Sequence, residues 1–339
     1  MDQGADEEPA IPSTNGHPWK AKRSVPVKLI IDADPGIGDA VAVALAVLDP
    51  EIELLAITAA AGRVSGDQAT RNLHGILSVL DAPRWPRIGC GEGPASFWPP
   101  EPGSIEPVML HGPQGVGDLD VPNTGLHQKH ESFKVLCEIV KTHPQDVTIL
   151  TLGPLTNLER AAEHWPEFWE NIHDVVCLGG ALNGPGDITA AAEFNIFADP
   201  EAAHAFLRSA VTKTMIPLEV ARHLQLSFEQ YTRLNMDKYS RVGQLLERTL
   251  PFALRSHRQH LGKEVLWMPE VAALASISES RMFERETMAV DVEMQGQLTR
   301  GMTIADRRPT SQWRRNTDVV TKFDARGVLD WMTRVLSKG

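Results

Sequence analysis

The sequence has few cysteines and no long apolar run. Its three cysteines, Cys90, Cys137 and Cys177, lie far apart in apolar or mixed surroundings. This pattern fits reduced core thiols better than a disulfide framework or a zinc site. No apolar stretch approaches the roughly 20 residues that a membrane helix needs, and the acidic start MDQGADEEPA is unlike a signal peptide. We therefore expect a cytoplasmic protein without a membrane partner.

Positive charge is also scarce. The 339 residues contain 33 Lys and Arg against 44 Asp and Glu, which gives a formal net charge of −11. Proteins that bind a phosphate backbone are usually basic, so we expect no nucleic-acid partner. The short basic run Lys20, Lys22 and Arg23 is typical of a solvated tail.

Strand-like and helix-like segments alternate along most of the chain. Residues 1–24 are rich in Pro, Gly, Ser and charge and are predicted to be a disordered leader, followed by one domain over 25–339. The predicted pairs of strand and helix are Val27–Ile31 with Ala40–Leu48, Leu54–Thr58 with Gln68–Leu80, Val147–Leu152 with Asn157–Ala162, and Val175–Leu178 with Glu201–Leu207, before a strand at Thr214–Leu218.

This alternation predicts an α/β fold with an open, mainly parallel, Rossmann-like sheet and helices on both faces. In such a fold the site lies at the carboxyl ends of the strands. Residues 84–125, rich in Pro and Gly, are predicted to be a long excursion over that edge. The later part of the chain is predicted to contain helices at Gln244–Leu250 and Glu270–Ile277, a strand at Ala289–Met294 and a helix at Val328–Leu336.

The most informative segment follows the first strand and reads DADPGIGD, residues 32–39. Strand alternation places Asp32 and Asp34 on one face, and the turn at Pro35-Gly36 brings Asp39 into the first helical turn. Three carboxylates at one place repel one another unless a hard cation, a basic side chain or protonation offsets their charge, and oxygen-rich clusters suit Ca²⁺ or Mg²⁺. The alternative is that Asp39 caps a helix and Asp32 accepts hydrogen bonds at a strand end.

The segment resembles the opening motif Asp-x-Asp-Pro-Gly-x-Asp-Asp of the inosine-uridine-preferring nucleoside hydrolases. The resemblance continues in the same order through AITAAAGRVSGDQATRN, LHGPQGVGD, ILTLGPLTNL, CLGGAL, GDITAAAEFNIFADPEAA and QLTRGMTIADRR. It implies the nucleoside hydrolase fold and hydrolysis of the N-glycosidic bond of a ribonucleoside. It also implies a small nucleoside-like ligand and a homo-oligomer, a dimer or a tetramer.

The resemblance further implies a calcium ion below the ribose that presents the attacking water to an aspartate. Asp34 would be the catalytic base and a calcium ligand, and Asp39 would be the main ligand. Leu152 would contribute its main-chain carbonyl, and Asp32 would support these residues from behind.

The sugar side of the motif is partly retained. Glu193 and Asn195 match the residues that bind the sugar hydroxyls, and Asp187 replaces an asparagine that meets the 5′-hydroxyl. His111 is placed among the substrate-binding residues. Without the resemblance, Glu193 and Asn195 could equally order a loop.

Several expected positions are altered. Gly38 replaces the first aspartate of the Asp-Asp pair, which binds ribose hydroxyls in the family. In VLWMPEVAALA, Trp267 replaces a histidine associated with the leaving base, and Met268 replaces a calcium-binding aspartate. A thioether is a poor ligand for a hard cation. Glu270 lies two residues further along a helix start, so we expect it to face away from the pocket and not to compensate.

Arg63 stands where the family usually has an asparagine beside the metal-bound water. Arginine is permanently charged and binds carboxylates in a fork. We therefore expect its guanidinium to reach Asp34 or Asp39 and to substitute for the cation. The alternative is an arginine on a surface loop that faces solvent.

Three readings of the function remain open at this point. The first is a hydrolase with weak or altered activity, and the second is a catalytically inactive, metal-free ligand-binding or regulatory protein. The third is a phosphohydrolase of the haloacid dehalogenase type, suggested by a strand that ends in Asp-x-Asp. That family needs Thr or Val soon after the second aspartate, whereas Pro35 and Gly36 follow here.

Overall fold

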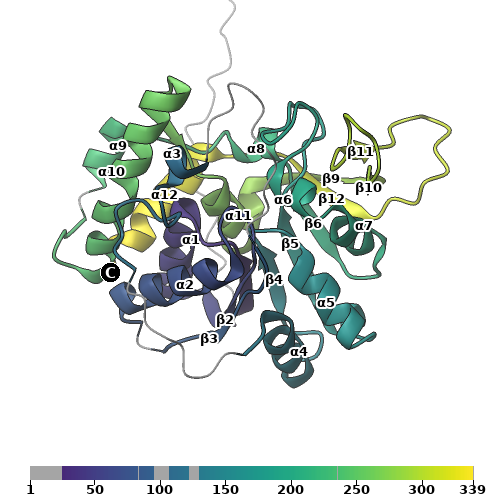
Figure 1. Cartoon of the computed structure of the whole chain (residues 1–339), viewed down its shortest axis with the longest axis horizontal. Helices are drawn as coiled ribbons and strands as arrows, with labels where there is room; N and C mark the ends of the chain where they lie inside the picture. The colour runs from purple at the N-terminus through teal and green to yellow at the C-terminus, as the bar shows by residue number, and fades with distance from the viewer. Residues whose placement is uncertain (1–24, 83, 95–106, 122–129, 235, 339) are drawn as a thin grey trace, which may run out of the picture.

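The computed structural model describes the whole chain except residues 1–24, 83, 95–106, 122–129, 235 and 339. The predicted leader and part of the predicted excursion over 84–125 therefore lie outside the described residues. The centre of the molecule is a twisted sheet with helices packed on both sides (Figure 1).

The central sheet has eight strands among the residues that the structure describes. In order across the sheet they are β3 (Arg87–Gly89), β2 (Ile52–Ala59), β1 (Val27–Ala33), β4 (Thr148–Thr151), β5 (Asp174–Leu178), β6 (Lys213–Ile216), β12 (Thr317–Phe323) and β9 (Phe283–Met288). Neighbouring strands are parallel except β12 and β9, which pair antiparallel at one edge. The predicted open, mainly parallel sheet is confirmed.

Two helical layers cover the sheet (Figure 1). One layer contains α1 (Ile37–Leu48), α2 (Gly66–Leu80), α10 (Arg241–Leu261), α11 (Pro269–Ser278) and α12 (Ala325–Leu336), and the other contains α4 (Ser132–Thr142), α5 (Thr156–His164) and α7 (Pro200–Arg208). Shorter elements are α3 (Pro107–His111), α6 (Phe194–Ala198), α8 (Leu218–Ala221), α9 (Phe228–Arg233), two 3₁₀ turns (Trp169–Asn171 and Ser280–Met282) and two small antiparallel pairs, β7 (Gln225–Ser227) with β8 (Val265–Trp267) and β10 (Val290–Val292) with β11 (Thr303–Ala305).

The alternation of side chains along β1 explains why the sheet needs both layers. Leu29, Ile31 and Ala33 belong to the core under α1, whereas Ile30 belongs to the core under α4. Both faces of the strand are apolar, so each must be covered. Burial of each leucine or isoleucine side chain among them contributes about 1.5–3 kcal/mol.

The edge formed by β9 and β12 differs from the prediction. The expected strand Ala289–Met294 is only the short β10, outside the main sheet, and β9 and β12 were not predicted. Most β9 side chains are exposed, so this edge strand lacks the continuous apolar run by which the buried strands were recognised.

The strand order reverses at β1, because β2 and β3 lie on one side of it and β4, β5 and β6 on the other. Loops that leave β1 and β4 in opposite directions open a crevice at the carboxyl edge of the sheet. The DADPGIGD segment leaves β1 at this point. No helix in the described part of the chain is long and apolar enough to cross a bilayer.

Candidate active site

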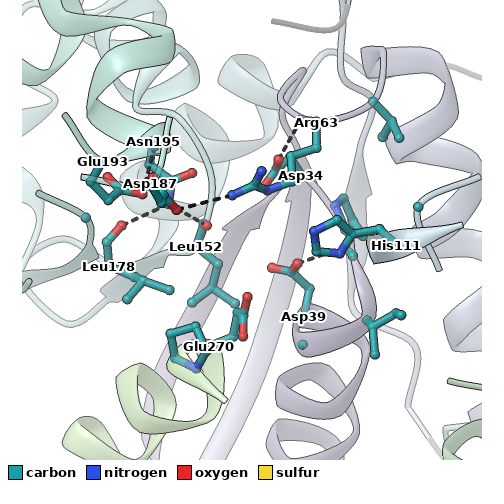
Figure 2. A pocket seen from close by; sticks show the side chains of 18 of the residues that line it. Asp34, Asp39, Arg63, His111, Leu152, Leu178, Asp187, Glu193, Asn195 and Glu270 are labelled. Carbon is teal, nitrogen blue, oxygen red and sulfur yellow. Dashed lines mark hydrogen bonds and ion pairs between the residues drawn. The ribbon is translucent and has the colours of Figure 1, made fainter. Parts of the chain in front are cut away.

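A pocket lies at the crevice, and the first turns of α1 and α11 contribute Asp39 and Glu270 to its lining (Figure 2). The predicted site residues that line it are Asp34, Gly38, Asp39, Arg63, His111, Leu152, Asp187, Glu193 and Asn195. Asp32, Trp267 and Met268 are not among its lining residues. Glu270, which was expected to face away, lines it.

Asp34 follows β1 and is almost completely buried. Its Oδ2 accepts a hydrogen bond from the backbone N–H of Arg63 at 2.9 Å. A Cβ on Gly62 would lie 2.1 Å from the same oxygen, so only glycine allows this approach. Burial, and then the charge of Asp39, raises the pKa of Asp34 to about 7. A carboxylate with such a pKa is suited to accept a proton near neutral pH.

Asp39 lies in the first turn of α1, where its Oδ2 accepts a hydrogen bond from the backbone N–H of Gly36 at 2.8 Å. Its Oδ1 is buried and has no hydrogen-bond partner among the described residues. Burial and the charge of Glu270 raise the pKa of Asp39. Asp39 therefore caps the helix with one oxygen and leaves the other for a ligand.

Asp32 is fully buried behind the pocket, between β2 and β4. Its Oδ1 accepts hydrogen bonds from the Thr58 hydroxyl and from the Asn157 amide, the latter at 2.8 Å. Burial raises the pKa of Asp32 to about 7. The hydrogen bonds join Asp32 to neighbouring elements, an arrangement suited to holding the loop that carries Asp34.

Glu193 and Asn195 lie at the start of α6. The Glu193 carboxylate accepts backbone N–H bonds from Gly180, Asn195 and Ile196, at 2.9, 2.8 and 3.2 Å. The Asn195 amide donates to the carbonyls of Leu152 and Leu178, at 2.8 and 3.0 Å. Both side chains order the pocket wall and also face the pocket, so the two readings of the sequence are compatible.

Arg63 points into the pocket, but its partner differs from the expected one. Its guanidinium lies 3.5 Å from Asp187 and 4.2 Å from the ring centroid of Phe194, and Figure 2 shows it directed toward Asp187. The expected contact of the guanidinium with Asp34 or Asp39 is not made, because the chain places only the Arg63 backbone N–H on Asp34. Its charge offsets part of the rise that burial causes in the pKa values of Asp34, Asp39 and Glu270.

A second arginine, Arg222, which no sequence motif indicated, lies near the same oxygen of Asp187 as Arg63 does. Arg222 is 3.9 Å from the Asp187 carboxylate and stacks over the ring of Trp267 at 4.6 Å. The edge of His257 also contacts this ring, with centroids 5.5 Å apart. Trp267 is thus engaged by protein side chains and not by the pocket.

Met268 and Glu270 face opposite directions at the start of α11, as helix geometry requires, but the prediction that Glu270 faces away from the pocket was wrong. Met268 is fully buried in the apolar core, and Glu270 enters the pocket. Burial is the main cause that raises the pKa of Glu270 to about 7. A Cβ on Gly38 would lie 2.0 Å from Glu270 Oε2, so the glutamate fills the space that a side chain at position 38 would occupy.

His111, at the end of α3, lies beside Asp39 in the pocket (Figure 2). Burial, and then the charges of Arg63 and His257, lowers the pKa of His111 to about 3. The imidazole is therefore neutral at neutral pH, suited to hydrogen bonding and poorly suited to donating a proton as an acid.

The pocket concentrates carboxyl groups around Arg63, which is the one arginine among its described lining residues, while Arg222 contacts Asp187 from outside that lining. No group of three or more His, Cys, Asp or Glu residues close enough to hold a metal is found among the described residues. Asp34 and Asp39 nevertheless offer carboxylate oxygens, with Asp39 Oδ1 unpartnered, and the Leu152 carbonyl has a second lone pair beyond its bond with Asn195. These oxygens fit a hard cation that completes its shell with water and ligand oxygens.

This geometry defines the class of the protein: an α/β protein with an acidic pocket at the point where the strand order of its sheet reverses. The family model described as "Inosine-uridine preferring nucleoside hydrolase" matches residues 29–330. The chain belongs to this family, and its function is that of a nucleoside hydrolase-like protein.

Curated relatives and solved structures agree with this assignment. The chain is 31% identical to "Uridine nucleosidase 1" of Arabidopsis thaliana, over 92% of this chain and 93% of the relative. It is 32% identical to "Non-specific ribonucleoside hydrolase RihC" of Salmonella schwarzengrund, over 91% and 97%. A "Purine-Preferring Ribonucleoside Hydrolase from Gardnerella vaginalis" superposes with a TM-score of 0.78 at 29% identity, over 92% of this chain and 98% of that one.

Proposed function

We propose that this protein hydrolyses the N-glycosidic bond of a ribonucleoside or a related N-riboside, with Asp34 as the catalytic base and with low activity or altered specificity. The observation that carries the proposal is the position of Asp34, a buried carboxylate at the switch point whose pKa is raised to about 7. Its relatives bear the names of nucleosidases and ribonucleoside hydrolases.

In this reaction Asp34 takes a proton from water, and the water oxygen forms a bond to the anomeric carbon of the ribose. The bond from that carbon to the base nitrogen breaks, and its electron pair leaves with the base, which takes a proton from solvent water. Asp34 returns the proton that it accepted to solvent, so that no net proton is gained or lost. Positive charge grows on the ribose in between. The carboxylates of Asp39 and Glu193, both facing the pocket, would stabilise that charge.

A Ca²⁺ ion would be held by Asp34, Asp39 and the Leu152 carbonyl. When bound, it would lower the pKa of a coordinated water and so supply a better nucleophile. Met268, buried in the core, offers no ligand, so the site has fewer protein ligands than the resemblance implied, and we expect weak calcium binding.

Four residues that line the pocket with Asp34 would bind the substrate: Glu193, Asn195, Asp187 and His111. Trp267, which was expected to bind the substrate, does not line the pocket, and Arg222 and His257 contact its ring, so we expect no direct contact with the base. It would instead hold Arg222 against Asp187.

One observation favours the alternative, a metal-free protein that binds a nucleoside-like ligand without hydrolysing it. The Arg63 guanidinium places a permanent charge inside the pocket, and this charge disfavours a second cation nearby.

The two functions are distinguished by a hydrolysis assay. Its substrates are a panel of purine and pyrimidine ribonucleosides and a chromogenic riboside, each measured with and without calcium. The hydrolase requires turnover that Asp34→Asn abolishes. Binding of the same compounds without turnover in either protein would establish the alternative.

We also propose a cytoplasmic dimer or tetramer. The three buried cysteines, which form no disulfide in the described part of the chain, support a reducing compartment. Exposed Phe228, Tyr239 and Leu298 support self-association. Light scattering coupled to gel filtration measures the mass directly, and a monomer at micromolar concentration would contradict this proposal.

A further inference from the structure

We propose that Glu270 is a specificity-determining substrate contact, whose carboxylate accepts a hydrogen bond from a hydroxyl of the sugar in place of a side chain missing at position 38. This inference rests on the proposed function, and it adds Glu270, which was expected to face away from the pocket, to the residues that bind the substrate. Its geometric basis is the pairing of two positions on different helices: a Cβ on Gly38 would lie 2.0 Å from Oε2 and 2.3 Å from Cδ of Glu270.

The local structure directs Glu270 into the pocket. Pro269 begins α11, and Glu270 is the second residue of its first turn. Helix α11 packs against α1, whose first turn carries Gly38 and Asp39. Two helix N-termini therefore meet at the pocket, and their partial positive charges favour the carboxylates of Asp39 and Glu270.

The other polar side chains in the described part of the pocket are largely engaged with the protein. Glu193 accepts three backbone N–H bonds, and Asp187 accepts the Phe194 N–H and faces two arginines. Glu270, by contrast, lines the pocket, and its carboxylate accepts no hydrogen bond from another residue in the described part of the chain. With Asp39 Oδ1, which has no partner in the described structure, it forms a pair of acceptors available to a ligand.

The chemistry of this pair indicates a ligand that carries hydroxyl groups. Carboxylate oxygens only accept hydrogen bonds when ionised, and hydroxyls donate strongly to them. The Cβ position of Gly38, which precedes Asp39 in the first turn of α1, lies 2.0 Å from Glu270 Oε2, so Glu270 lies beside Asp39, on the side of the pocket where water is activated. A general acid for the leaving base would have to lie across the sugar from that water, so Glu270 is assigned to the sugar.

The experiment compares inosine, 2′-deoxyinosine and 3′-deoxyinosine as ligands of the native protein and of Glu270→Gln. Glutamine keeps the size and the helix-end position but loses the charge. We expect the variant to lose about tenfold in kcat/KM, mainly through KM, on the substrate that donates the hydroxyl. For at least one deoxynucleoside, kcat/KM should be the same in the variant as in the native protein. Glu264 is an exposed residue paired with Arg258, and Glu264→Gln is the control. This variant should leave kcat/KM unchanged for all three nucleosides.

A second comparison tests whether Glu270 takes the place of a side chain at position 38. Gly38→Asp alone should be poorly folded or inactive, because its Cβ meets the Glu270 carboxyl. Gly38→Asp combined with Glu270→Ala should recover the discrimination that Glu270→Ala alone loses. An equal loss on all three nucleosides, or a double variant worse than both single variants, would overturn the proposal.

Calorimetric binding of the same three nucleosides separates this proposal from the proposed function. If the native protein binds inosine but hydrolyses neither inosine nor any compound of the panel above, the hydrolase is refuted. The role of Glu270 is still supported in that case if Glu270→Gln loses the discrimination in affinity. Loss of calcium binding in Glu270→Gln, with unchanged discrimination between the nucleosides, would instead overturn the hydroxyl contact.

Discussion

The guanidinium of Arg63 lies 3.5 Å from the carboxylate of Asp187, across the pocket from the Asp34 oxygen that the Arg63 backbone holds. One residue thus contacts both sides of the site. The Phe194 ring below the guanidinium keeps it in this position. The pocket therefore has a built-in cation whose charge acts on Asp34, Asp39 and Glu270.

Replacement of this cation should improve calcium binding. Arg63→Asn removes the positive charge while it keeps the backbone N–H on Asp34, and we expect the affinity for calcium to rise by about tenfold or more. Isothermal titration in low salt measures the affinity. Arg255→Asn, which breaks the exposed pair with Asp118, is the matched control. Equal or weaker calcium binding in Arg63→Asn would show that Arg63 does not compete with a cation.

Restoration of an aspartate at position 268 should fail. Met268 is fully buried among apolar side chains, so Met268→Asp places a carboxyl in the core and should lower the free energy of unfolding by about 2–4 kcal/mol. Met268→Leu should cost less than about 1.5 kcal/mol. Urea denaturation compares the two variants. A Met268→Asp protein that is as stable as the native protein and binds calcium would contradict the placement of Met268.

The stability of the metal-free protein should increase as the pH falls from about 8 to about 6.5. Burial raises the pKa values of Asp32, Glu193 and Glu270 to about 7. A carboxyl with a raised pKa stabilises the folded state below its ordinary pKa, and this contribution is lost as the pH rises through the folded value. Below about 6.5 the neutral His111, whose pKa is lowered, acts in the opposite direction.

Urea denaturation in the presence of a chelator measures this dependence. Glu193→Gln should weaken it, because the variant removes one of the titrating groups. A free energy of unfolding that is constant or lower at about pH 6.5 would show that the buried carboxyls titrate near their ordinary values.

The activity should depend on pH in the opposite direction. Asp34 must be ionised to accept a proton, and its pKa is raised to about 7. We therefore expect kcat/KM to fall about tenfold for each pH unit below that value and to level off above it. A profile that is flat down to pH 5 would exclude Asp34 as the base with this pKa.

The parallel sheet could be predicted from the sequence because its inner strands are continuous apolar runs. β9 could not be, since an exposed edge strand lacks that pattern. The acidic loop could also be predicted from the sequence. Asp32, Asp34 and Asp39 are close together in the sequence, and their placement depends on local geometry.

The remaining parts of the site depend on contacts between distant segments. The direction of Glu270 is set by the packing of α11 against α1 and by the space that Gly38 leaves. The partner of Arg63 is set by the loop that carries Asp187 and Phe194. Arg222 has no sequence motif, and its position follows from its stacking on Trp267.

The central claim is that Asp34 makes this pocket a hydrolase, and it is tested most directly by assaying purified native protein and Asp34→Asn on a chromogenic riboside with added calcium. We predict slow turnover by the native protein and a loss of about a hundredfold or more in the variant, since general-base catalysis contributes at least that much. Equal rates in the two proteins, at the level of the uncatalysed reaction, would contradict the claim.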